Sequence, residues 1–132
     1  MELEWNKYYE DAIGYFKVAK GAASKGTLGN TVIYNVISMA VENFMTALLM
    51  KENFLPTHSS ISSMLREIKK KYTVPEEYSA EVRFINRFMN FCSLEVLPAV
   101  EILDEDIIRM LTFLDSFKVW TDQVLVPALS PE

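Results

Sequence analysis

Apolar residues recur at three- and four-residue steps along most of this chain, which is the spacing of one face of an α-helix. The pattern predicts a first helix over residues 3–23 and a second from residue 28 or 30 to residue 52. Gly21, Gly26 and Gly29 predict the loop between them. Because the second helix is apolar around most of its circumference, we expect it to be central. Its expected buried residues are Val32, Ile33, Val36, Ile37, Ala40, Val41, Phe44 and Leu48.

Three further helices are predicted in the second half of the chain. We expect Thr57 to cap the short third helix, and Pro75 to occupy the first turn of the fourth, where proline's missing amide hydrogen is not needed. Asp104 begins an acidic first turn of the last helix, where negative charge interacts favourably with the positive end of the helix dipole. The expected buried residues are Ile61, Met64, Leu65, Ile68 and Tyr72, then Tyr78, Val82, Ile85, Phe88 or Met89, and Cys92, then Ile107, Met110, Leu111, Leu114 and Phe117.

The chain shows no repeat, no low-complexity segment and no strand pattern. Five helices with short connections predict an all-α fold, an antiparallel up-and-down four-helix bundle with an additional short helix. The length of 132 residues suits one domain, which we place at residues 1–126, with a C-terminal tail over residues 127–132. A connector over residues 94–103 contains Pro98.

Composition and charge narrow the choice of function. Half of the residues are apolar, which is enough for an ordinary globular core, and the net charge is −5. General nucleic-acid binders are usually basic, so we expect any contact with a polyanion to be local. The single cysteine cannot form an internal disulfide, and the longest uncharged run, residues 26–41, is too short and polar for a membrane span. We therefore expect a cytoplasmic protein without a membrane segment.

The sequence offers few residues for catalysis or metal binding. Its four glycines match no phosphate-binding fingerprint, and no Glu-x-x-His pair is present for a di-iron site. One cysteine and one histidine do not supply a zinc site, and no nucleophile-elbow sequence accompanies His58. We expect no cofactor and no metal.

A polar stripe on the fourth helix is the strongest candidate site. Arg83, Asn86, Arg87 and Asn90 follow one another at i, i+3, i+4 and i+7, so they share one face. Two guanidinium groups beside two amides could hold a phosphate or a carboxylate bidentately. The alternative is a solvated face opposite the buried one.

A second polar stripe lies on the central helix and consists of Thr31, Asn35, Ser38, Glu42 and Thr46. A single carboxylate in a neutral polar stripe is unusual there. Glu42 could pair with Arg83 or Arg87 if the two helices pack together, in which case the stripes would form a cleft. The alternatives are a satisfied polar seam or a subunit contact.

Two other polar features have simpler explanations. His58 lies at a helix start, where it serves a cap or loop contact more readily than proton transfer. The basic run Arg66, Lys69, Lys70 and Lys71 lies near a helix end, where cations stabilise the negative end of the dipole. A contact with RNA backbone is the alternative for this run.

Residues 5–120 resemble the HEPN (higher eukaryotes and prokaryotes nucleotide-binding) domain family. The resemblance rests on Ala-Val-Glu-Asn-Phe-Met-Thr-Ala-Leu-Leu at residues 40–49, followed by Pro-Thr-His at residues 56–58. The family commonly shows Ala-x-Glu-Lys-x-x-Lys-Ala-Leu in its second helix, and a Thr-His helix start typically follows. Asn43 and Thr46 replace the two lysines.

Many HEPN domains are metal-independent RNases with an Arg-x4–6-His motif assembled across a homodimer. The matching stretch here is Arg-Phe-Met-Asn-Phe-Cys, so Arg87 is present but Cys92 stands where histidine belongs. Phe88 stands where the family prefers a polar residue, and no histidine follows His58. A thiol is a poor substitute near neutral pH unless its pKa is depressed. The resemblance therefore implies a degenerate, non-nucleolytic member.

Three functions remain open from the sequence. The first is a non-catalytic, homodimeric binding module that presents Arg83 and Arg87 to a nucleotide, RNA or protein partner; the resemblance implies a minimal nucleotidyltransferase of the toxin–antitoxin type as such a partner. The second is a divergent RNase toxin that uses Arg87 with Cys92 or His58. The third is a structural homo-oligomer without a ligand.

Overall fold

The computed structural model of the protein describes residues 4–56, 60–92 and 101–126, with the backbone alone at residues 89–92. Within these ranges every regular element is helical, which confirms the predicted all-α class. The helices are α1 (Trp5–Lys25), α2 (Asn30–Lys51), α3 (Ile61–Lys69), α4 (Tyr78–Cys92) and α5 (Asp104–Leu125). Pro98 and the predicted tail lie outside the described residues.

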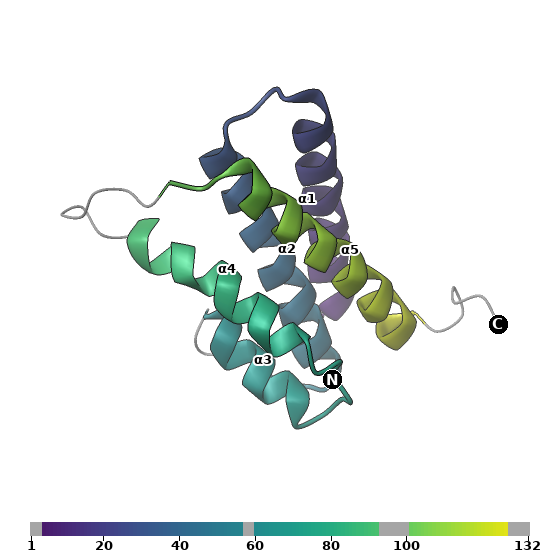
Figure 1. The fold of residues 1–132 in the computed structure, drawn as a ribbon. Helices are drawn as coiled ribbons and strands as arrows, with labels where there is room; N and C mark the ends of the chain where they lie inside the picture. The colour runs from purple at the N-terminus through teal and green to yellow at the C-terminus, as the bar shows by residue number, and fades with distance from the viewer. Residues whose placement is uncertain (1–3, 57–59, 93–100, 127–132) are drawn as a thin grey trace.

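The α2 helix is the centre of the fold, as its sequence predicts. It packs against α1, α3 and α5, and Tyr34 joins it to α4 by donating a hydrogen bond of 2.9 Å to the carbonyl oxygen of Ile85. In Figure 1 α1 lies beside α2, α5 crosses in front of both, and α3 and α4 lie together on the side away from α1. The helices around α2 therefore remove most of its apolar surface from water, which stabilises the fold.

Burial on α2 differs from the sequence prediction at one end. Val32 is 46% exposed although we expected it in the core, whereas Ile37 and Leu48 are fully buried. In the same turns Ile33 and Tyr34 are buried, and Asn30 donates hydrogen bonds to the Ile102 carbonyl and the Asp104 carboxylate, so neighbours cover only part of this end of α2. Apolar periodicity alone does not show where along a helix its neighbours end.

The α1 helix continues through Gly21 and ends at Gly26, so the predicted loop position of Gly21 is wrong. Gly26 has the left-handed φ of 65° typical of a helix C-terminus, and its amide donates to the carbonyl oxygen of Ala22 at 2.9 Å. Ala12 and Ala19 are fully buried, which lets α1 approach α2 closely. We infer that this packing outweighs the helix penalty of Gly21, about 1 kcal/mol.

The starts of α3 and α4 also differ from the predictions. The residue before α3 is Ser60, whose hydroxyl oxygen caps the helix by accepting from the Ser63 amide at 3.4 Å. Thr57, the predicted cap, lies outside the described residues. Pro75 lies in the turn before α4, where its carbonyl oxygen accepts from the Tyr78 amide. In contrast, α5 begins at Asp104 with the expected acidic first turn.

Side chains from α1, α2, α4 and α5 meet in an aromatic core. Phe117 is fully buried and contacts the rings of Phe44, Tyr78, Phe113 and Trp120 at centroid distances of 5.3–6.0 Å. Tyr9 adds α1 to this core through an edge contact with Phe44. These contacts explain why α5 is held across α1 and α2.

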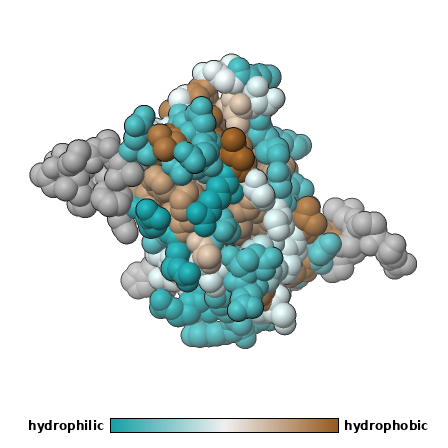
Figure 2. Space-filling view, in the orientation of Figure 1, coloured by the Kyte–Doolittle hydropathy of each residue, from teal (hydrophilic) through white to brown (hydrophobic). Residues whose placement is uncertain are grey.

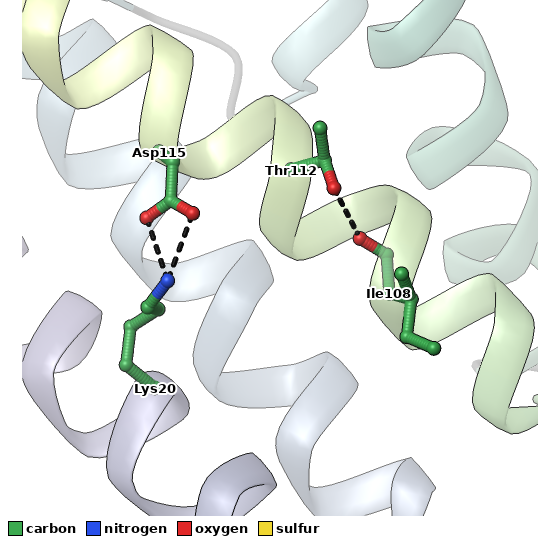
Figure 3. A network of polar contacts seen from close by, with 4 residues as sticks. All are labelled: Lys20, Ile108, Thr112 and Asp115. Carbon is green, nitrogen blue, oxygen red and sulfur yellow. Dashed lines mark hydrogen bonds and ion pairs between the residues drawn. The ribbon is translucent and has the colours of Figure 1, made fainter.

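Polar contacts fix α5 to α1 at the surface. Lys20 donates to both carboxylate oxygens of Asp115 at 2.8 and 2.9 Å (Figure 3). Within α5, the Thr112 hydroxyl donates to the Ile108 carbonyl oxygen at 2.8 Å, also drawn in Figure 3. Both partners of the ion pair are more than 40% exposed, so it contributes at most about 1 kcal/mol to stability.

Among the described helices, α2 is the one that is long and apolar enough to cross a membrane by length and composition. In the fold, 61% of its most apolar window is buried by protein. The core helix of a soluble protein has the same length and composition.

Candidate functional site

The α4 helix presents the predicted polar stripe of Arg83, Asn86, Arg87 and Asn90, which we call the α4 stripe. Arg83 and Arg87 are exposed and Asn86 is half-buried, while the Asn90 side chain lies outside the described part. The opposite face carries Tyr78, Val82, Ile85 and Phe88, all buried as expected. Burial of this apolar face turns both arginines outward, where they can reach a ligand.

Three of the four arginines have no ion-pair partner among the described residues. Arg109 is the exception, because its Nε and Nη2 atoms donate to the two carboxylate oxygens of Glu81 at 2.9 and 3.1 Å. No described carboxylate lies within ion-pair distance of Arg66, Arg83 or Arg87. Their positive charge is therefore available to an external anion.

Arg83 lines a groove between α3 and α4 that has a volume of about 340 Å³. The lining residues of this α3–α4 groove are Ser62, Leu65, Arg66, Lys69, Ser79, Val82 and Arg83. The amino group of Lys69 donates to the hydroxyl oxygen of Ser79 across the groove. Three lining residues are cationic and none is acidic, so the groove is a local basic site on an acidic protein.

Arg87 lies one helical turn beyond Arg83 and does not line the groove. Its guanidinium carbon is 5.9 Å from the centre of the Phe84 ring, and the guanidinium carbon of Arg109 is 4.0 Å from the centre of the same ring. Phe84 is 9% exposed, so the ring is a buried platform for both cations. The α4 stripe thus extends along the helix, from the groove at Arg83 to the Phe84 ring at Arg87.

The polar stripe of α2 does not form the cleft that we considered. Thr31 and Asn35 are exposed, whereas Ser38 is buried and its hydroxyl has no described hydrogen-bond partner. Glu42 is half-buried and forms no ion pair with Arg83 or Arg87, so the pairing hypothesis is wrong. The α2 helix bonds to α4 through Tyr34, which lies about two helical turns before Glu42.

Burial raises the pKa of Glu42 above its ordinary value of 4.5, since few groups replace the water lost by its carboxylate. The folded protein then binds this proton more tightly than the unfolded protein does. The charged Glu42 carboxylate therefore destabilises the folded state relative to the unfolded state. This destabilisation is fully present above the raised folded-state pKa and disappears as pH falls below the unfolded-state pKa.

We therefore expect Glu42→Gln to stabilise the protein near pH 7 by at most about 1 kcal/mol, because the half-exposed carboxylate is still screened by water. The gain should vanish below the ordinary value of 4.5. Urea unfolding at a series of pH values measures it. Glu76→Gln, which removes a charge from an exposed position, is the control; the same pH dependence in both variants would contradict the prediction.

A second pocket of about 340 Å³ lies on the other side of α4, against α5. It is lined by Glu77, Tyr78, Glu81, Arg109, Thr112, Phe113 and Ser116. Figure 2 shows apolar surface between the hydrophilic residues of α4 and α5. Since the Glu81 carboxylate is already bound by Arg109, and the Tyr78 and Ser116 hydroxyls bond each other at 2.8 Å, this pocket offers fewer free polar groups than the α3–α4 groove.

The described residues contain no group of three histidine, cysteine or carboxylate side chains that could hold a metal ion. His58 and the side chain of Cys92, the two candidates for the missing RNase histidine, lie outside the described part of the chain. The geometry of a divergent RNase site at Arg87 thus remains a sequence prediction.

No family model, no curated protein and no solved structure matches this chain. The resemblance to the HEPN family therefore rests on sequence motifs alone, at residues 40–49, at residues 56–58 and from Arg87 to Cys92.

The sequence predicts Arg83 and Arg87 as site residues but does not predict the partners that α3 contributes. Arg66 and Lys69 were explained by the dipole at the end of α3, and that explanation still applies, since both lie in its last turn. Ser62 and Ser79 carried no sequence signal. The sequence feature that could have indicated the groove is a basic helix end followed, after a short turn, by a helix with arginines on its polar face.

Proposed function

We propose that this protein is a non-catalytic binding module whose α4 stripe binds a phosphate-bearing partner, a nucleotide or RNA. The observation that carries the proposal is the exposure of Arg83 and Arg87 on one face of α4 without an ion-pair partner among the described residues. Guanidinium groups bind phosphate oxygens through paired, charge-assisted hydrogen bonds. Because the net charge of the chain is −5, we expect a small, local footprint on the ligand.

The HEPN resemblance supports the finer parts of this proposal. Under this proposal the helices form an up-and-down four-helix bundle with a short extra helix. Two copies of the chain pair about a two-fold axis in the cytoplasm, and their protein partner is a minimal nucleotidyltransferase. Cys92 in place of the motif histidine supports binding without cleavage, since no histidine follows Arg87 in the chain to activate a 2′-hydroxyl.

Replacing Arg87 tests the proposal directly. We expect Arg87→Ala to weaken binding of a fluorescent single-stranded RNA hexamer about tenfold or more, the equivalent of about 1.5–3 kcal/mol for a lost charge-assisted hydrogen bond. Fluorescence anisotropy at 50 and 200 mM salt measures the affinity, and the salt dependence should also decrease. Lys25→Ala is the matched control, since it removes a cation from the far end of α1.

The same assay separates the proposal from its alternatives. Equal affinity in wild type and Arg87→Ala would remove the α4 stripe from the binding site. RNA that is cut by wild type but not by Arg87→Ala would establish the divergent RNase instead. Sedimentation of both proteins without RNA reports the oligomeric state, and a dimer that Arg87→Ala abolishes, with no RNA or nucleotide bound, would favour the structural homo-oligomer.

A further inference from the structure

The α3–α4 groove combines the chemical groups of a phosphate site from two separate helices. Arg66 and Lys69 come from the end of α3, and Arg83 comes from the middle of α4. The hydroxyls of Ser62 and Ser79 lie in the same lining. Hydroxyls can donate hydrogen bonds to phosphate oxygens, and cations neutralise the negative charge of the phosphate.

The helix dipole accounts for only part of this arrangement. Cations in the last turn of α3 stabilise its negative end, which explains Arg66 and Lys69 individually. Arg83 belongs to a different helix, away from either end, so the dipole of α3 does not require it. The nearest acidic residue in the α3 sequence, Glu67, forms its ion pair with Lys70 at 3.1 Å.

Three like charges in one groove repel one another unless an anion joins them. The volume of about 340 Å³ lies at the lower end of the range for small-ligand pockets, about 300–1,000 Å³. In Figure 2 the surface over α3 is mostly hydrophilic, which suits a polar ligand. Leu65 and Val82, which are buried, line the groove together with the charged groups.

We propose that the α3–α4 groove binds the terminal phosphate of a phosphate monoester, with Arg66, Lys69 and Arg83 as its charge partners and Ser62 and Ser79 as hydroxyl donors. A monoester carries about −1.5 to −2 charges near pH 7, whereas each phosphodiester of a nucleic-acid chain carries one. Three cations match the monoester better than an internal diester. This inference rests on the proposed function and narrows its ligand to one with a terminal phosphate.

The test compares two RNA hexamers of one sequence, one with a 5′-phosphate and one with a 5′-hydroxyl, each with a 3′ fluorophore. We expect wild type to bind the phosphorylated hexamer about tenfold or more tightly. Arg66→Gln and Lys69→Gln should each reduce this ratio toward one. Lys71→Gln should leave it unchanged, because Lys71 is just beyond the same helix but does not line the groove. Circular dichroism confirms that each variant is folded.

Adenosine 5′-monophosphate and adenosine, added as competitors, identify the source of the phosphate. Displacement by the monophosphate but not by adenosine supports a groove that accepts free nucleotides. A preference for the 5′-phosphorylated hexamer without displacement by the monophosphate supports a groove that binds the phosphate only together with the adjoining RNA.

Equal binding of the two hexamers, with Arg87→Ala still weakening both, would overturn the groove inference and leave the proposed function intact. A phosphate preference that survives Arg66→Gln and Lys69→Gln would also overturn it. If neither hexamer binds and the monophosphate is not bound in a direct titration, both proposals fail.

Discussion

Phe117→Ala is expected to destabilise the protein by about 3–5 kcal/mol, the usual cost of removing a buried aromatic ring. Phe117 is fully buried and touches rings from α2, α4 and α5: it packs edge-on against Phe44 and Tyr78 and is stacked with Phe113 and Trp120. The cavity left behind would have walls on three helices, so it cannot close by a local shift. Since domains of this size are stable by about 5–15 kcal/mol in total, the variant should be marginally folded.

Urea unfolding followed by far-UV circular dichroism measures this effect. Val119→Ala is the matched control, because Val119 lies on the same helix but is 56% exposed, and its replacement should change stability by no more than about 0.5 kcal/mol. Trp120 fluorescence should change in Phe117→Ala, since the two rings are stacked at 6.0 Å. Similar unfolding midpoints for the two variants would contradict the aromatic core described above.

The five helices of the described ranges could be predicted because helical periodicity is local. Apolar spacing located each helix that the structure describes, and the acidic start of α5 at Asp104 matched the structure. The errors arose where tertiary packing outweighs local preference: α1 continues through Gly21, and α4 begins three residues after Pro75. A single sequence does not show how strongly a neighbouring helix favours one boundary over another.

The candidate site was predictable only within one helix. Arg83 and Arg87 share a face because they are four residues apart, which requires no knowledge of other helices. The contact between Lys69 and Ser79 depends on how α3 and α4 are placed, and this is set by packing across the core. The pairing of Glu42 with the arginines failed for the same reason, since the rotation of α2 about its own axis is not evident from its nearly uniform apolar pattern.

The central position of α2 gives the second large prediction. Ile37→Ala should destabilise the protein by about 2–5 kcal/mol, because Ile37 is fully buried and its loss leaves a cavity at the centre of the fold. Val32→Ala is the control on the same helix. Both residues belong to the apolar pattern that predicts burial, but Val32 is 46% exposed and its replacement should cost no more than about 0.5 kcal/mol.

Urea unfolding of the two variants and the wild type, without RNA or nucleotide present, distinguishes two explanations of the apolar circumference of α2. If the helix is surrounded as described, only Ile37→Ala shifts the midpoint strongly. Equal, large losses in both variants would mean that Val32 is also covered, and a concentration-dependent loss in Val32→Ala would identify a second copy of the chain as the cover. Equal, small losses would contradict the central position of α2 itself, because a cavity between several helices lowers the free energy of unfolding by a larger amount.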